Sequence, residues 1–297
     1  MKIFGYTFIV LCLIASCKME KSDSVESLVS LEEKFKSDKS DSTWLKLVYK
    51  IGSDIQNTKD QETKAKLYQK AIEYSSAPGQ ENMKETFMSE LLKLHPKKEQ
   101  DILFELATSW NNKDDKEIGA ILYAGFIENF PNDPRSITIK ESASRNIKDH
   151  QKYFSLLSKE VTLKASNTGL NNEKALQYIN HAEAFGLGFA VNKAVPDYLM
   201  LAADLSRALG DINRSIGFYD WIHQYYPDHK DAKLALFLQA YETDTNLKKY
   251  ADAEKIYKEF LIKHPNDPLA KDVKFLMSNL GKAADTLFKE MQYETKK

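Results

Sequence analysis

Six histidines are the residues of this chain best suited to metal binding or to general acid–base chemistry. They stand at His95, His150, His181, His223, His229 and His264. None belongs to an HExxH pair, and none has a cysteine partner at the spacing of a zinc site. His95 and His264 each directly precede a proline. We expect surface or helix-capping roles for all six and no metal site.

Motifs for nucleophilic or nucleotide chemistry are also missing. The sequence contains no GxSxG, no P-loop and no GxGxxG, and the stretch GLGF at 186–189 lacks the preceding strand that such fingerprints require. The remaining Asp and Glu pairs are typical of solvated helix faces. The sequence therefore predicts no catalytic residue, no cofactor and no enzyme.

The composition favours an all-α protein. Of 297 residues, 42% are apolar, which is enough for a continuous core in one long or two ordinary domains. Only 11 Gly and 8 Pro are present, whereas the good helix formers Leu, Lys, Glu and Ala dominate. Because 42 basic side chains face 43 acidic ones, no long-range field attracts nucleic acid, and no nucleic-acid partner is expected.

The N-terminus differs in character from the rest. Fourteen largely apolar residues, 3–16, follow Met1 and Lys2. This stretch is too short to span a bilayer as a helix and has the length of a signal-peptide core. It ends in Ile14-Ala15-Ser16-Cys17, which resembles the lipobox of bacterial lipoproteins. The resemblance implies that residues 1–16 are a signal peptide and that the thiol of Cys17 carries a diacylglycerol thioether.

This anchor defines an expected location. Cys12 would leave with the signal peptide, so Cys17 is the one cysteine that remains and no internal disulfide can form. Two or three acyl chains would hold the protein on a membrane. Residues 17–40 are polar and poor in aromatics, which predicts a flexible tether with a short helix around 27–35. We expect an outer-membrane location on the periplasmic face; CKMEK at 17–21 only partly resembles a surface-export signal, and the cell surface remains the alternative.

Helical periodicity begins near residue 41 and continues to the C-terminus. Spacings of three and four indicate an amphipathic helix with Ser42 or Thr43 as its N-cap; its apolar residues are Trp44, Leu45, Leu47, Val48, Ile51 and Ile55. No later stretch alternates with period two. We therefore predict one helical repeat domain over residues 41–297.

Three stretches repeat one pattern before Pro131, Pro227 and Pro265. A tyrosine lies eight residues before each proline, and small residues recur further upstream; the tyrosines are Tyr123, Tyr219 and Tyr257, and the small residues Ala107, Gly119, Ala203, Ala240 and Ala253. This pattern resembles the tetratricopeptide repeat. The resemblance implies an α-solenoid of antiparallel helix pairs, in which small residues allow close crossings, tyrosines fill the space between helices, and prolines end the second helix.

The array is irregular in its middle. Pro131 and Pro227 are 96 residues apart, too few for three clean units. Helices are predicted at 136–147, 150–165 and 171–186, with breaks at 167–169 and 186–188, but their pairing is open. Residues 267–282 are predicted to form a C-terminal capping helix closed by Gly281.

In tetratricopeptide arrays the first helix of each pair lines a groove that holds a peptide, so the resemblance implies a partner-binding face. In this chain the corresponding positions are Phe104, Thr108, Asn111, Met200, Asp204, Arg207, Phe237, Tyr241 and Asp244. Solvent-facing positions without a partner are the alternative. Phe237 and Tyr241, one turn apart, are the best candidates for a contact hot spot.

The combination of lipobox and repeats is similar to bacterial tetratricopeptide lipoproteins, especially the outer-membrane-assembly lipoprotein that supports β-barrel insertion. The repeats of this chain also resemble those of a periplasmic protein that coordinates envelope constriction with peptidoglycan synthesis. These resemblances imply a lipid-anchored scaffold that binds a protein or peptide. Three hypotheses stay open: an accessory of envelope assembly, a coordinator of peptidoglycan synthesis or division, and a surface component of a nutrient-uptake complex.

Overall fold

The computed structural model describes residues 26–77, 79–95, 98–163 and 169–282. Within these ranges the secondary structure consists of α-helices and one 3-10 helix, with no strand, and the predicted all-α class is confirmed. The chain divides into two compact units, one up to Val195 and one from Pro196, and each is described by itself. The expected signal peptide and Cys17 lie outside the described residues.

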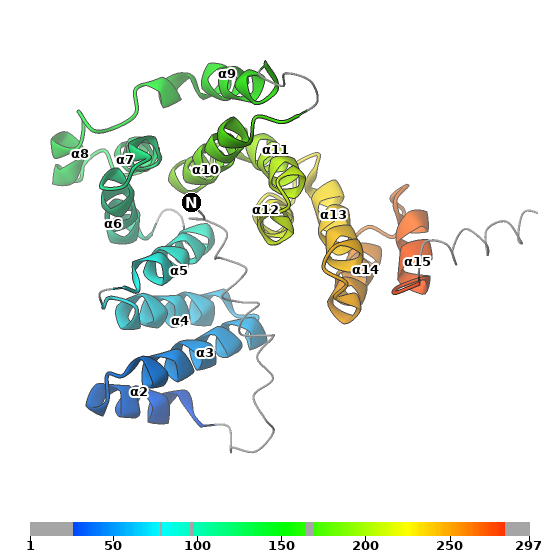
Figure 1. The fold of residues 1–297 in the computed structure, drawn as a ribbon, viewed down its shortest axis with the longest axis horizontal. Coiled ribbons are helices and arrows are strands. Elements are labelled where there is room, and N and C mark those ends of the chain that lie inside the picture. Colours follow the sequence, from blue (N-terminus) through cyan, green and yellow to red (C-terminus); the bar gives the residue numbers. More distant parts are fainter. Residues whose placement is uncertain (1–25, 78, 96–97, 164–168, 283–297) are drawn as a thin grey trace, which may run out of the picture. The chain divides into compact units, whose positions relative to one another are not determined.

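The first unit is a succession of helices in which each helix from α2 to α7 packs against the next (Figure 1). Helix α2 pairs with α3, α4 with α5, and α6 with α7, while α7 also packs against α10, and α10 against α9. The bounds are α2 Leu28–Ser37, α3 Asp41–Asn57, α4 Gln61–Tyr74, α5 Glu81–Leu94, α6 Gln100–Asn111, α7 Lys116–Asn129, α8 Pro134–Thr138, η1 Asn146–Asp149, α9 His150–Leu163 and α10 Asn172–Gly188.

The packed part of the chain begins earlier than the sequence predicts. The short helix expected within the 17–40 tether is present as α2, and it is packed rather than free: Leu31 is buried, and Phe35 meets Tyr74 of α4 edge to face at 5.6 Å. The N-cap of α3 is Ser40, whose Oγ accepts from the Thr43 amide at 3.4 Å. The predicted caps, Ser42 and Thr43, lie inside the helix.

Close helix crossings in this unit depend on glycine. A Cβ added to Gly119 would lie 2.4 Å from the amide nitrogen of Asn111, so the predicted close approach of α6 and α7 is confirmed. Where α7 crosses α10, a Cβ on Gly125 would lie 2.5 Å from the Cα of Gly188. The side-chain amide of Asn129 stabilises this crossing by donating a hydrogen bond to the Gly188 carbonyl at 2.7 Å.

Two predictions for the middle of the chain are wrong. Residues 186–188 are not a break, because α10 continues through Gly186 and ends at Gly188, where α7 crosses it. Of the helix predicted at 136–147, only residues 136–138 are α-helical, as the end of α8, and residues 146–147 belong to η1. Between α8 and η1 the backbone turns so that the Ser144 amide donates to the carbonyl of Ala120 in α7 at 2.9 Å, and this contact replaces a helical hydrogen bond.

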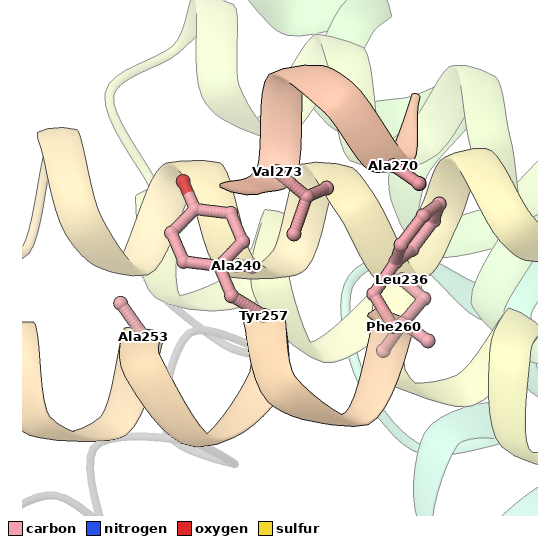
Figure 2. Close-up of a cluster of buried hydrophobic side chains, with 7 residues drawn as sticks. All are labelled: Leu236, Ala240, Ala253, Tyr257, Phe260, Ala270 and Val273. Atoms are coloured by element: carbon pink, nitrogen blue, oxygen red, sulfur yellow. The ribbon is translucent and has the colours of Figure 1, made fainter. Parts of the chain in front are cut away.

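The second unit contains the two repeat patterns nearest the C-terminus. Its helices are α11 Val195–Ala208, α12 Ile212–Tyr225, α13 Ala232–Thr245, α14 Tyr250–Lys263 and α15 Ala270–Ser278. Helix α13 packs against both α12 and α14, and α15 packs against α14. Figure 2 shows the resulting core, in which side chains from three helices meet: Leu236, Ala240, Ala253, Tyr257, Phe260, Ala270 and Val273.

The residue types of the repeats have the predicted structural roles. Ala107, Ala203, Ala240 and Ala253 are completely buried. Helices α7, α12 and α14 each end two residues before a repeat proline. The predicted capping helix is α15, and Gly281 follows it with φ +74°, a left-handed conformation that glycine adopts at little cost.

Candidate partner-binding face of the helix pairs

One hydrogen bond recurs between the two helices of each repeat pair. The Tyr123 hydroxyl of α7 donates to Thr108 of α6 at 3.0 Å, and the Tyr219 hydroxyl of α12 donates to Asp204 of α11 at 3.0 Å. In the third pair, the Tyr257 hydroxyl of α14 donates to Asp244 of α13 at 3.4 Å. We call these the tyrosine bonds. Three of the nine predicted groove residues, Thr108, Asp204 and Asp244, therefore form hydrogen bonds within their own helix pair.

The predicted positions on α6 do not form an open surface. Phe104 is half-buried, with its ring centroid 5.3 Å from that of Phe126, and the guanidinium of Arg135 lies over it at 4.7 Å. Thr108 donates to the Phe104 carbonyl and accepts from Tyr123. Asn111 is half-buried in the last turn of α6. An aromatic anchor for a partner is therefore not exposed here.

The predicted positions on α11 take part in a charged network. Met200 is half-buried, and Asp204 accepts from Tyr219. Arg207 is exposed and lies 3.7 Å from Asp204 and 3.6 Å from the buried carboxylate of Glu242 in α13. This network links α11 to α13, and Arg207 is the predicted residue on α11 that is most open to a partner.

Helix α13 carries Phe237 and Tyr241, the aromatic pair that the sequence singles out, and the pair is partly exposed. The rings of Phe237 and Tyr241 are stacked, with centroids 6.1 Å apart and planes at 24°, and Tyr241 is 37% exposed. Leu234, one turn earlier, is 38% exposed. Spacings of three and four place the three side chains on one helix face. We call Leu234, Phe237 and Tyr241 the α13 stripe.

The α13 stripe packs against the core of the second unit through Phe237. Phe237 is half-buried and meets Phe260 of the core at 6.4 Å, edge to face. Sequence reasoning missed Leu234, although its spacing from Phe237 was a signal. Asp244, the third predicted residue on α13, is only 8% exposed, and its carboxylate accepts from Tyr257.

Burial of Asp244 leads to a pH prediction. Burial raises the pKa of Asp244 above its ordinary value of 3.8, and the hydrogen bond from Tyr257 partly opposes this. The folded state then holds the proton more tightly than the unfolded chain, so stability falls as pH rises from 3.8 through the folded pKa. Asp244→Asn keeps an acceptor for Tyr257 and should raise stability at pH 7 by roughly 1 kcal/mol.

Urea unfolding of parent and variant across pH checks this result. The difference should shrink as pH falls through the folded pKa toward 3.8, and it should be smallest below 3.8, where the parent carboxyl is protonated in both states. The exposed Asp228→Asn serves as the control and should leave stability nearly unchanged. A constant difference at all pH values would mean that the charge of Asp244 is not its cause.

Two histidines depart from the predicted surface role: His223 in α12 is only 8% exposed, and His181 differs most. His181 is fully buried in α10, with Nδ1 2.6 Å from the Tyr153 hydroxyl and Nε2 3.3 Å from the Asp115 carboxylate. Since a carboxylate only accepts, Nε2 donates to Asp115, and Nδ1 accepts from Tyr153. Burial raises the pKa of Tyr153, and the hydrogen bond from His181 lowers that of Asp115. A buried, protonated phenol is a poor nucleophile, so we interpret this chain of bonds as a brace between α9, α10 and the start of α7. The predicted positions of His95 and His264 at helix C-termini are confirmed.

Asp197, His229 and Asp231 form the group whose side chains lie closest to a metal-binding arrangement in the described part of the chain. The contacts argue against an ion. Nδ1 of His229 accepts from the Asp231 amide at 3.3 Å, which places the ring proton on Nε2, the nitrogen that faces Asp197 at 3.5 Å. The ammonium of Lys230 already lies 2.9 Å from Asp197. We interpret the group as an ion-pair cluster between α11 and the turn before α13.

Comparison of the chain with known proteins returns no matching family, no matching curated protein and no matching solved structure. Within the ranges that the structure describes, no helix has both the length and the apolar character needed to cross a membrane.

Proposed function

We propose that the protein is a lipid-anchored scaffold of the bacterial cell envelope that binds a protein or peptide partner. It is an accessory of outer-membrane or envelope assembly. The all-helical architecture of paired helices supports this proposal, because such pairs display long side-chain faces with few loops. The α13 stripe supports the partner-binding part.

The pairs are of the tetratricopeptide type in this proposal. Three observations support that assignment: buried small residues in the pairs, helix ends two residues before each repeat proline, and a tyrosine bond in each of three pairs. The bonded residues are 15, 15 and 13 positions apart. The third interval is two residues shorter than the other two, because Tyr257 bonds to a residue nearer the end of its first helix.

The anchor in this proposal is Cys17. The lipobox Ile14-Ala15-Ser16-Cys17 supports it, since the site of lipidation lies directly after an apolar segment of signal-peptide length. Helix α2 starts at Leu28, so only about ten residues separate the anchor from helical structure. The folded part would accordingly stay close to the membrane surface.

The α13 stripe is the single observation that carries the partner-binding proposal. Aromatic side chains that are half-exposed and backed by a rigid core are the typical hot spots of protein interfaces. Phe237 and Tyr241 meet this description, because they stack on each other and rest on Phe260. Leu234 extends the apolar surface by one turn. A partner with an apolar helix or strand face fits this surface.

In-cell crosslinking followed by affinity purification of the full, tagged chain tests the proposal. Phe237→Ala/Tyr241→Ala should reduce recovery of the partner by about tenfold or more, since losing two central aromatic contacts commonly costs more than 2 kcal/mol. The matched control is Ile262→Ala/Phe275→Ala, which removes two other exposed apolar side chains of the same unit. It should leave recovery unchanged.

The identity of the recovered protein decides between the hypotheses. Components of the β-barrel insertion machinery would support the assembly role. Wall synthases would favour the coordinator of peptidoglycan synthesis, and subunits of an uptake complex would favour the surface role. Equal recovery with both double variants would contradict binding at the α13 stripe.

A further inference from the structure

A cavity of about 560 Å³ lies in the first unit, where η1, α9 and α10 meet. Figure 1 shows α9 and α10 next to each other. Pockets for small ligands typically measure about 300–1,000 Å³. The side chains that matter for the argument are Lys148, Lys152, Tyr153, Leu156, Lys174 and Gln177. The cavity belongs neither to the α13 stripe nor to the repeat tyrosines.

The charges around the cavity are unbalanced. Four cationic and two acidic side chains line it. Lys174 is neutralised by Glu160 at 2.9 Å, and the second acid, Asp149, accepts from the backbone amide of Lys152 at 3.1 Å. Arg145 pairs with Glu141 at 2.9 Å. Among the described residues, the ammonium groups of Lys148 and Lys152 have no acidic partner.

The cavity that these two lysines line also has an apolar surface, formed by Tyr153 and Leu156. Lys152 and Leu156 are four residues apart on one face of α9, and Lys148 of η1 lines the same cavity. Leu156 is 52% exposed, and Tyr153, three residues earlier in α9, lines the same cavity with its hydroxyl fixed by His181 at 2.6 Å. Cations near the N-terminus of a helix are unfavourable for helix stability, so helix formation gives no reason for this pair.

We propose that this cavity binds a small amphiphilic anion. A carboxylate or phosphate group lies between the ammonium groups of Lys148 and Lys152, and an apolar chain lies over Leu156 and the Tyr153 ring. Charge complementarity supplies the anchor for the head group, because each ammonium forms a charge-assisted hydrogen bond. The fixed Tyr153 ring supplies a preorganised apolar surface. The ligand is taken up from solution as a single molecule, not as part of a bilayer.

Isothermal titration of the purified full chain with decanoate, below its micelle concentration, tests the proposal. Saturable binding of one decanoate per chain is expected. Lys148→Gln/Lys152→Gln should weaken it by about tenfold or more, since both charged contacts are lost. Leu156→Ser should weaken decanoate binding as well. Circular dichroism checks that the exposed substitutions leave the helices intact.

A matched control separates the site from net charge. Lys271→Gln/Lys274→Gln removes two exposed lysines from α15 and should leave decanoate binding unchanged. Equal weakening in both double variants would overturn the proposal, as would equal binding of decyltrimethylammonium, which has the opposite charge. Absence of saturable heat would also overturn it. Binding to phosphatidylglycerol vesicles without binding of free decanoate would assign these lysines to a membrane surface instead, and would contradict a small-molecule site.

Discussion

Gly125→Ala is expected to destabilise the first unit by about 3 kcal/mol, because the crossing of α7 and α10 leaves no room for a methyl group. The new Cβ would meet the backbone of Gly188 at 2.5 Å, and backbone atoms cannot move aside as a flexible side chain can. The hydrogen bond from Asn129 to the Gly188 carbonyl would be strained by the same displacement. Urea unfolding and hydrogen exchange of α7 and α10 measure the effect.

Gly217→Ala is the matched control for this result. Gly217 also lies inside a helix, α12, but a Cβ there would meet nothing within 4 Å. Alanine is the better helix former by about 0.5–1 kcal/mol, so this variant should be slightly more stable than the parent. Similar behaviour of the two variants would contradict the close crossing at Gly125.

Phe260→Ala is expected to cost the second unit about 4 kcal/mol. Phe260 is completely buried in the cluster shown in Figure 2, next to Leu236 of α13 and Ala270 in the first turn of α15. Its removal leaves a cavity that helices on both sides can fill only by moving. The backing of Phe237 would be lost as well. Thermal and urea unfolding, followed by circular dichroism, measure the loss.

Ile262→Ala, two residues further along α14, provides the comparison. Ile262 is 80% exposed, so its replacement should change stability by less than about 0.5 kcal/mol. Both substitutions remove a large apolar side chain from the same helix, and burial is the main difference between them. A small effect of Phe260→Ala, near that of Ile262→Ala, would contradict the packing of α13, α14 and α15 around Phe260.

Much of the fold was predictable from the sequence because a few residue types define a helix pair. Buried Ala107, Ala203, Ala240 and Ala253 and the repeat prolines all have the expected roles. Glycine was harder to interpret. Gly188 can end a helix or accept a crossing helix, and it does both, but the second role depends on Gly125, 63 residues away in the sequence.

The candidate site was predictable in part. Spacing alone places Phe237 and Tyr241 on one face, and the structure agrees. The roles of Asp204 and Asp244 depend on tyrosines in the following helix, and sequence spacing does not reveal which polar group a hydroxyl reaches. The buried position of His181 and the cavity beside Tyr153 also required the structure, because both arise where segments from three helices meet.

Site-specific photocrosslinking tests most directly the central claim that the α13 stripe contacts a protein partner. A benzoylphenylalanine replaces Tyr241 in one sample and Ile262 in another, in the full chain and in living cells. Both positions are exposed, but only Tyr241 belongs to the stripe. We predict one dominant crosslinked protein from position 241 and none of that species from position 262. The same crosslinks from both positions, or crosslinks from position 262 alone, would contradict the claim.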